Sequence, residues 1–153
     1  ASDVYKRQVQ NVEVLDLDGK PVKLPYFGEK NLMIFYVDPD RHKQNEDFTV
    51  ELEKNHRAES DKIHGFGVMN LKDAPMVPNG MARNMAKKRT AKNGATVLAD
   101  QNRILSTAWA LGDCNNQFVL MIVSKEGELV FLRKGELSDA DKEAFYETIE
   151  KYK

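Results

Sequence analysis

Cysteine is almost absent from this sequence. Cys114 is the single cysteine among the 153 residues. An internal disulfide needs two cysteines, and a cysteine-rich metal site needs more. The chain therefore lacks the residues for either, and one cysteine leaves the redox compartment open.

The sequence also lacks an excess of charge of one sign and a long apolar run. Its 23 basic and 24 acidic residues give a formal net charge of −1, so the whole molecule has no field that would direct it to nucleic acid or a membrane. No apolar stretch approaches the roughly 20 residues of a transmembrane helix. With 41% hydrophobic residues, the chain suits one domain with its own core.

The first eight residues, "ASDVYKRQ", stand apart from the rest. Asp3 to Gln8 can be encoded by GAT GTG TAT AAG AGA CAG, which resembles the end of a transposase-type sequencing adapter read in frame. Such segments are excluded from reasoning about the fold; the alternative is a natural polar tail. We therefore expect residues 1–8 to lie outside the fold, residues 9–153 to form one domain, and the original N-terminus with any signal peptide to be missing.

Strand and helix patterns alternate along residues 9–153. Residues 12–17 alternate apolar and polar side chains before Asp18-Gly19, a strong hairpin signal. The continuous apolar run Asn31–Val37 predicts a strand buried on both faces. Further strands are expected at residues 63–71 and 95–100, a hairpin at 117–135, and helices at 42–58, 79–94, 102–111 and from Ser138, where Asp141 completes a near capping box.

The order of these elements predicts an α/β fold. Strands that alternate with helices indicate parallel strands joined by right-handed crossovers, and the hairpin at residues 117–135 adds antiparallel strands. This mixture resembles the thioredoxin-like fold. The resemblance implies a mixed β-sheet flanked by helices, here extended by an N-terminal β-hairpin.

The resemblance also locates where such a fold carries its redox site. In thioredoxins, the strand equivalent to Asn31–Val37 ends in a loop whose two cysteines begin the next helix, where the helix dipole lowers a thiol pKa. Residues 40–43 of this chain, "DRHK", fall at that position and contain no thiol. A peroxiredoxin site would need a cysteine in the same loop. Residues 116–118, Asn-Gln-Phe, stand where thioredoxins have a cis-proline. We therefore predict no dithiol–disulfide exchange at this site.

A closer resemblance covers residues 70–141. It runs through "NLKDAPMVPNGMAR", "LADQNRILSTAWAL" and "VLMIVSKEGELVFLRKGELSDAD", which resemble the YtfJ-type thioredoxin-like proteins of Gram-negative bacteria. The resemblance implies an exported, periplasmic protein of unsettled function, sometimes catalogued as a transcriptional regulator. It supplies no catalytic residue and no cofactor. We therefore predict a binding or accessory module, with a protein or a small ligand as partner.

The loop after residues 31–37 is the first candidate site. Asp38, Asp40 and His42 alternate there, a pattern that could hold a divalent metal. Asp40 is more simply a helix N-cap, and Asp38 the start of a turn. Arg41 and His42 could instead receive an anion at the helix N-terminus. We expect no metal here.

A second candidate is the loop of residues 70–80, which contains two prolines and a glycine. Long loops in compact domains are often functional. In a thioredoxin-like layout, this loop follows the strand beside the active-site strand, so Asn70 and Asp73 are expected to face the surface of residues 40–43. The alternative is a rigid connector that ends in a helix cap at Asn79-Gly80. The predicted binding site is Asp38, Asp40, Arg41, His42, Asn70 and Asp73.

Cys114 lies in the polar stretch "GDCNNQ" before the second hairpin. A nucleophilic thiol needs a cation or a helix N-terminus beside it, whereas the neighbouring Asp113 would raise the thiol pKa. An inert or weakly oxidisable thiol is the favoured interpretation. A single-cysteine oxidoreductase or peroxidase that uses Cys114 is the alternative.

Residues 83–92 form a basic run with five cations and no acid. Met81 and Met85 would bury one face of such a helix, and cations near its C-terminus favour the helix dipole. No aromatic residue interleaves the cations and no recognised DNA-binding motif is present. A solvated face is the default interpretation, and a nucleic-acid-binding regulator is the second alternative.

Overall fold

The structure is a computed structural model of the chain. It describes residues 6–41, 43–71, 96–101, 103–114 and 116–153. The strands are β1 (Arg7–Gln8), β2 (Glu13–Leu15), β3 (Pro21–Lys23), β4 (Asn31–Val37), β5 (Ile63–Asn70), β6 (Val97–Asp100), β7 (Phe118–Val123) and β8 (Glu128–Lys134). The helices are the 3-10 helix η1 (Pro39–Arg41) and the α-helices α1 (Glu46–Asn55), α3 (Ile104–Ala108) and α4 (Asp139–Tyr152).

The described strands form one sheet in the order β1-β8-β7-β4-β5-β6-β2-β3. β4, β5 and β6 run parallel to one another, whereas β7 and β8 are antiparallel neighbours on the other side of β4. The mixed sheet predicted from the order of elements is therefore confirmed. The predicted strand at residues 31–37 is also confirmed, because β4 has these bounds and lies between two neighbours.

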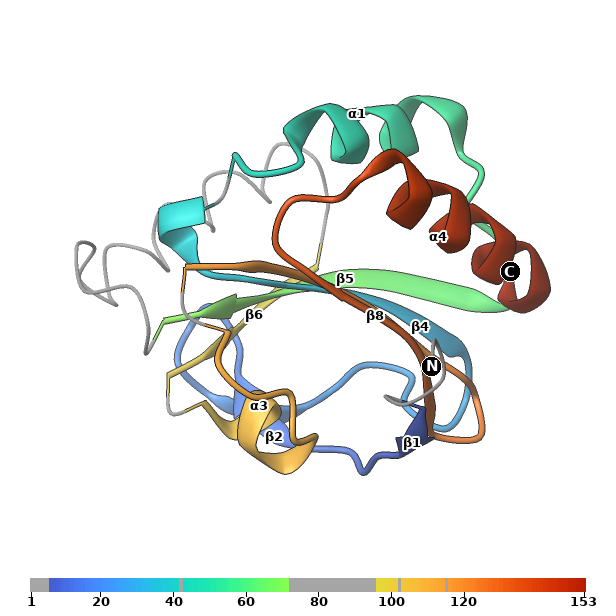
Figure 1. Cartoon of the computed structure of the whole chain (residues 1–153). Helices are drawn as coiled ribbons and strands as arrows, with labels where there is room; N and C mark the ends of the chain where they lie inside the picture. Colours follow the sequence, from blue (N-terminus) through green and yellow to red (C-terminus); the bar gives the residue numbers. More distant parts are fainter. Residues whose placement is uncertain (1–5, 42, 72–95, 102, 115) are drawn as a thin grey trace.

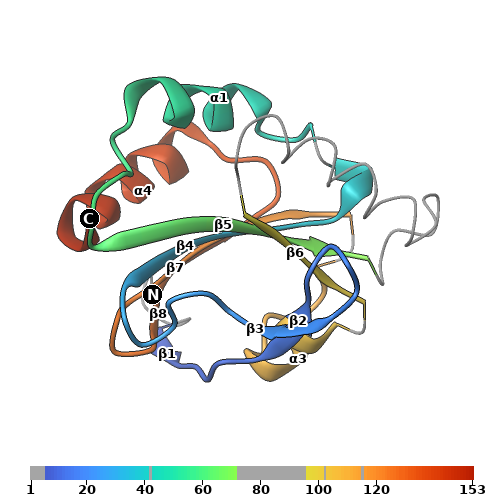
Figure 2. The same ribbon diagram turned by 180° about the vertical axis from the view of Figure 1, so that it is seen from behind.

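Helices cover the sheet on both faces. Figures 1 and 2 show α1 and α4 together over one face of the central strands β4, β5, β7 and β8. On the other side lie α3 and the edge strands β1, β2 and β3 of the same sheet. On the first face, Phe48 of α1 and Phe145 of α4 meet with ring centroids 5.3 Å apart. On the second face, Trp109 after α3 is buried against the core that contains Val14 of β2. Two apolar layers thus hold the sheet between them.

The start of α4 follows its sequence signal. Ser138 Oγ accepts a hydrogen bond from the Asp141 amide at 3.1 Å, and the Asp141 carboxylate accepts one from the Ser138 amide at 3.0 Å. This reciprocal pair satisfies two amides that the helix itself leaves unbonded. The predicted capping box is confirmed.

The start of α1 differs from the prediction that Asp40 is its N-cap. Residues 39–41 form η1, in which the Arg41 amide donates to the Asp38 carbonyl at 2.8 Å. The α-helix begins only at Glu46, with Asn45 as its N-cap in a left-handed conformation. Asn45 directs its side chain at the β8–α4 connection, where its Oδ1 accepts from the Leu137 amide at 2.9 Å. Residues 40–43 therefore precede the helix.

The N-terminal boundary also differs from the prediction. Arg7 and Gln8 were expected outside the fold, but they form β1 and pair with Leu129 and Glu128 of β8. Arg7 also donates to the Trp109 and Ala110 carbonyls, at 3.4 and 3.3 Å. The guanidinium therefore bonds carbonyl groups that are distant in the sequence. A pattern of two adjacent residues does not reveal such partners.

β2 and β3 pair antiparallel through a turn at residues 16–20. Gly19 has φ 83°, the left-handed conformation that glycine adopts at low cost. The predicted helix at residues 79–94 lies outside the described residues. Within the described part of the chain, no helix has the length and apolar character needed to cross a membrane.

Candidate functional site

Three polar residues stand at the carboxyl ends of the parallel strands. Asp38 directly follows β4, Asn70 ends β5 and Asp100 ends β6, and each side chain is fully buried with 0% exposure. The register pairs Asn70 with Asp100 and places Val37 opposite Met69. The three ends therefore form one continuous edge. In open α/β sheets, ligands bind at this edge.

Asp100 is the best-bonded member of this edge. Its carboxylate accepts from the Ile104 and Leu105 amides and from the Tyr36 hydroxyl, each at 2.9 Å. The two amides belong to the first turn of α3, where a helix leaves its amides unbonded. Asp100 therefore fixes the direction in which α3 leaves the sheet.

Tyr36 lies beneath this edge, on β4. Burial is the main cause that raises its pKa far above the ordinary value, and the Asp100 charge adds to the effect, while a hydrogen bond with Ser106 opposes it. The phenol consequently stays protonated and acts as a donor to Asp100. The Cys114 thiol is also close enough to contribute to the raised pKa of Tyr36.

Asp38 connects β4 to the segment before β7. Its Oδ2 accepts from the Asn116 amide at 2.9 Å, and its own amide donates to the Gln117 carbonyl at 3.1 Å. These are the positions at which the sequence comparison with thioredoxins expects a cis-proline. No cis peptide bond occurs in the part of the chain that the structure describes. A buried carboxylate thus holds this loop in place.

The predicted binding residues separate into three groups. Asp38 and Asn70 lie at neighbouring strand ends and both are buried, whereas Asn70 is predicted to face the surface of residues 40–43. Arg41 is exposed in η1, and the Asp40 backbone belongs to the same turn. His42 and Asp73 lie outside the described residues, as does the basic run 83–92.

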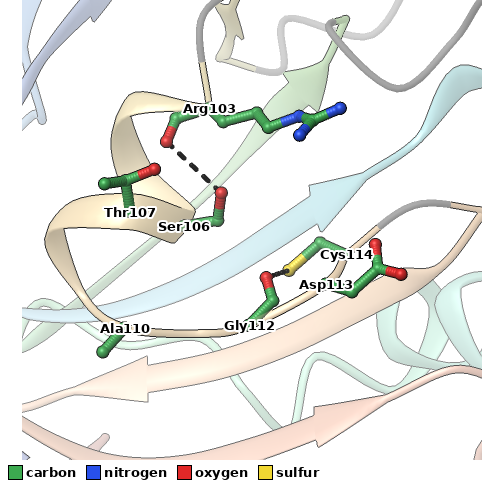
Figure 3. A pocket seen from close by; sticks show the side chains of 7 residues that line it. All are labelled: Arg103, Ser106, Thr107, Ala110, Gly112, Asp113 and Cys114. Carbon is green, nitrogen blue, oxygen red and sulfur yellow. Dashed lines mark hydrogen bonds between the residues drawn. The ribbon is translucent and has the colours of Figure 1, made fainter.

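A pocket opens beside α3, close to Asp100 and Tyr36. Its volume is about 570 Å³. Ser106 and Cys114 are buried in it, while Arg103, Thr107 and Asp113 are exposed. Figure 3 shows that the pocket lies between α3 and the loop that precedes β7. Its lining residues are Arg103, Ser106, Thr107, Ala110, Gly112, Asp113 and Cys114.

Sequence reasoning found only one part of this pocket. It identified Cys114 and the neighbouring Asp113, but it missed Arg103, Ser106 and Thr107. The available signal was the presence of four polar residues, Asn102, Arg103, Ser106 and Thr107, in the short, otherwise apolar segment "NRILSTAWAL". That signal does not identify the loop that faces α3, because the sheet, and not the local sequence, determines which loop lies there.

The cysteine has limited access to solvent. Cys114 is 2% exposed, and its Sγ donates to the Gly112 carbonyl at 3.7 Å, a long and weak bond even for sulfur. Among the described residues, no three His, Cys, Asp or Glu side chains gather in a group able to hold a metal ion. The pocket lining combines a buried thiol, two hydroxyls and one charged residue of each sign.

Comparison with known proteins gives a fold without a specific family. No protein-family model and no curated protein sequence matches the chain. Solved structures match along nearly its whole length. The exposed lipoprotein thioredoxin of Streptococcus pneumoniae superposes with a TM-score of 0.66 at 19% identity, covering 93% of this chain and 99% of its own. The chain has a thioredoxin-like fold.

Two further structures share the same fold over nearly the whole chain. The thioredoxin domain of a thiol-disulfide oxidoreductase from Bacteroides vulgatus matches with a TM-score of 0.61 at 17% identity, covering 95% of each chain. A peroxiredoxin-like protein from Aquifex aeolicus matches with a TM-score of 0.63 at 10% identity, covering 95% of this chain and 85% of its own. At such low identities, the likeness establishes the fold alone.

This thioredoxin-like chain has no dithiol. Its loop after β4 carries Asp, Arg, His and Lys at residues 40–43, and its one cysteine stands in the loop before β7. The polar residues at the strand ends instead connect strands to loops: Asp38 bonds the segment before β7 and Asp100 bonds α3. Hydrogen bonds thus join the strand ends beside residues 40–43 to the neighbouring segments.

Proposed function

We propose that this protein is a thioredoxin-fold binding or accessory module that does not exchange disulfides. The observation that carries the proposal is the single cysteine, Cys114, which is 2% exposed. Disulfide exchange begins when an accessible thiolate attacks a disulfide sulfur, and a second thiol then releases the product. This chain has no second thiol, and burial hinders the attack by its only one.

The hydrogen-bonded strand ends support a binding role. Asp38 and Asp100 hold the loop before β7 and the start of α3 in fixed positions. A binding site gains affinity when its walls are ordered before the ligand arrives, because less entropy is lost on association. The edge therefore has the rigid support that a ligand or partner site requires.

We further propose that the protein is of the YtfJ type and is exported to the periplasm. The motif residues in "NLKDAPMVPNGMAR" and "LADQNRILSTAWAL" support this assignment. The second motif contains Asp100, whose three accepted hydrogen bonds give a structural reason for an acid at that place. Fractionation of cells that express the complete gene tests the location: recovery with the cytoplasm would overturn it.

A single-cysteine enzyme is the alternative that the pocket keeps open, because Cys114 lines it. Peroxide consumption with dithiothreitol as reductant tests this alternative. We expect the wild-type protein and a Cys114→Ser variant to match the rate in buffer. Consumption that is faster with the wild type and lost in Cys114→Ser would overturn the proposed function.

A further inference from the structure

We propose that the turn of residues 26–30 leaves the end of α3 when His64 is protonated, so that the packing of α3 depends on pH. This turn, the 26–30 turn, directly precedes β4. The inference goes beyond the proposed function, because it concerns the control of the helix beside the pocket and holds whatever ligand binds there.

The backbone bonds of the 26–30 turn join the turn to itself. The Glu29 and Lys30 amides both donate to the Tyr26 carbonyl, at 2.9 and 3.0 Å. Tyr26 has φ 58°, a left-handed conformation that is uncommon for a residue other than glycine. Such a conformation persists where the surrounding contacts impose it. The side-chain contacts of the turn therefore decide whether it keeps its place.

Two aromatic contacts attach the 26–30 turn to neighbouring elements. The Tyr26 ring meets the His64 ring of β5 in a T-shaped arrangement, with centroids 4.8 Å apart. The Phe27 ring lies 6.5 Å from the Trp109 ring, centroid to centroid. Trp109 is the C-cap of α3 and precedes Ala110, which lines the pocket. Two adjacent residues of the turn thus connect His64 to the end of α3.

The surroundings of His64 suit a neutral ring. Its ring also stacks on Phe66, with centroids 5.8 Å apart. Its Nε2 is buried, and within the described residues this atom has no hydrogen-bond partner. Protonation would place an N–H donor and a positive charge there, and a buried charged donor without an acceptor is unfavourable. The contact between Tyr26 and His64 therefore belongs to the neutral form.

The charges around His64 also oppose its protonation. Lys30 Nζ lies 4.7 Å from the centroid of the Tyr26 ring that His64 contacts. The β4 residue paired with His64 is the uncharged Leu32, and the charged residue nearest to it along β5 is the exposed Lys62. The titratable residues of the turn itself are Tyr26, Glu29 and Lys30. Burial, followed by the Lys30 charge, lowers the pKa of His64. Because Lys30 belongs to the turn, the repulsion acts between the turn and β5.

The direction of the pH dependence follows from these contacts. Above the ordinary histidine pKa of about 6.5 the ring is neutral, and the turn stays in contact with His64 and Trp109. As the pH falls through the lowered pKa of folded His64, protonation favours the released turn, in which the ring reaches water. Phe27 then leaves Trp109, and the end of α3 loses a packing partner.

Acrylamide quenching of Trp109 fluorescence between about pH 8 and about pH 5 tests the inference. Trp109 is the single tryptophan and is 1% exposed, so its quenching constant should be low at the upper pH and rise as the pH falls. Far-UV circular dichroism should stay unchanged over this range, because the turn is released without unfolding. The midpoint of the rise should coincide with the titration of the His64 ring followed by NMR.

Two variants identify the group responsible. His64→Gln cannot take up a proton in this range, so its quenching constant should not depend on pH. His56 is exposed and paired with Glu59, and His56→Gln should behave like the wild type. Lys30→Gln removes the neighbouring cation and should shift the midpoint to higher pH, whereas the control Lys54→Gln, on α1, should leave it unchanged.

Four results would overturn the inference. They are a quenching constant that does not change with pH, a rise accompanied by loss of the circular dichroism signal, a rise that persists in His64→Gln, and a midpoint that differs from the titration of His64 in the wild type. The last comparison needs no variant, so the inference stays testable if His64→Gln fails to fold. None of these results bears on disulfide exchange or peroxide consumption, and failure here is distinguishable from failure of the proposed function.

Discussion

Asp100 shows how one buried carboxylate organises this fold. It is fully buried, and it accepts hydrogen bonds from two α3 amides and from Tyr36. A buried charge is costly unless it is well bonded, and three donors at 2.9 Å meet that requirement. Because two of these donors belong to α3, the Asp100 carboxylate positions both α3 and the pocket beside it.

Replacing Asp100 with alanine should destabilise the protein by about 3 kcal/mol or more, because two buried donors and one half-buried donor lose their acceptor and each such loss costs about 1–3 kcal/mol. Tyr36→Phe removes only one donor and should cost about 1 kcal/mol. Urea unfolding followed by tryptophan fluorescence measures both values. Equal losses in the two variants would show that Asp100 does not hold α3.

The sequence predicts Asp38 and Asn70 as binding residues, with Asn70 facing the surface of residues 40–43, and the structure buries both. A polar residue at a strand end looks the same in sequence whether it points outward or into a loop connection. Their burial depends on the Asn116 segment and on neighbouring strands, which are distant in the chain. Patterns of nearby residues do not contain this information.

At the scale of elements, sequence patterns predicted correctly those elements whose contacts are local. β4 agrees with its apolar run, and α4 starts at its capping box. The start of α1 was misplaced because Asn45 is held by Gly135 and Leu137, about ninety residues away. Aspartate is a residue type that favours a helix N-cap, so Asp40 was a reasonable start by local sequence. The tertiary contacts of Asn45 instead place the start of α1 at Glu46.

The α4 capping box should be measurable by itself. Ser138→Ala is expected to destabilise the protein by about 1 kcal/mol, because the Asp141 amide loses its acceptor.

The hydrogen bond from the Ser138 backbone amide is the main cause that lowers the pKa of Asp141. The stability that Asp141 contributes is therefore present above its unfolded pKa, near 3.8, and is lost as the pH falls through the lower folded value. Urea midpoints measured down to pH 3 should show a shallower acid loss in Asp141→Asn; equal slopes would contradict this.

His64 on β5 should make stability depend on pH near neutrality. Its ring packs between Tyr26 and Phe66, and within the described residues its Nε2 is buried with no hydrogen-bond partner. Burial, followed by the Lys30 charge, lowers the pKa of His64. The folded state thus prefers the neutral ring, and stability is full above the unfolded pKa of about 6.5 and falls as the pH drops below it.

The effect of His64 is measured from urea midpoints at pH 7.5 and 5.5. The wild type should lose more stability between these values than His64→Gln, which cannot take up a proton. His56 lies outside the β-strands and is paired with Glu59, so His56→Gln is the matched control. A loss that is equal in wild type and His64→Gln would contradict the assignment.

At the scale of the whole molecule, the order of strands and helices was sufficient to predict the fold class. The mixed sheet and the thioredoxin-like fold follow from the parallel β4–β5–β6 set and the β7–β8 hairpin. The pocket could not be predicted in the same way. Its two walls, residues 103–107 and 110–114, meet because Asp100 and the sheet orient α3, and no local pattern records that orientation.

The central claim is that this thioredoxin-like chain does not exchange disulfides. The most direct measurement is the rate at which dithiothreitol reduces insulin disulfides with and without the protein. Cys114 is the only thiol and is 2% exposed, so we predict that wild type and Cys114→Ser both leave the rate of dithiothreitol alone unchanged. A faster rate with the wild type that disappears in Cys114→Ser would contradict the account.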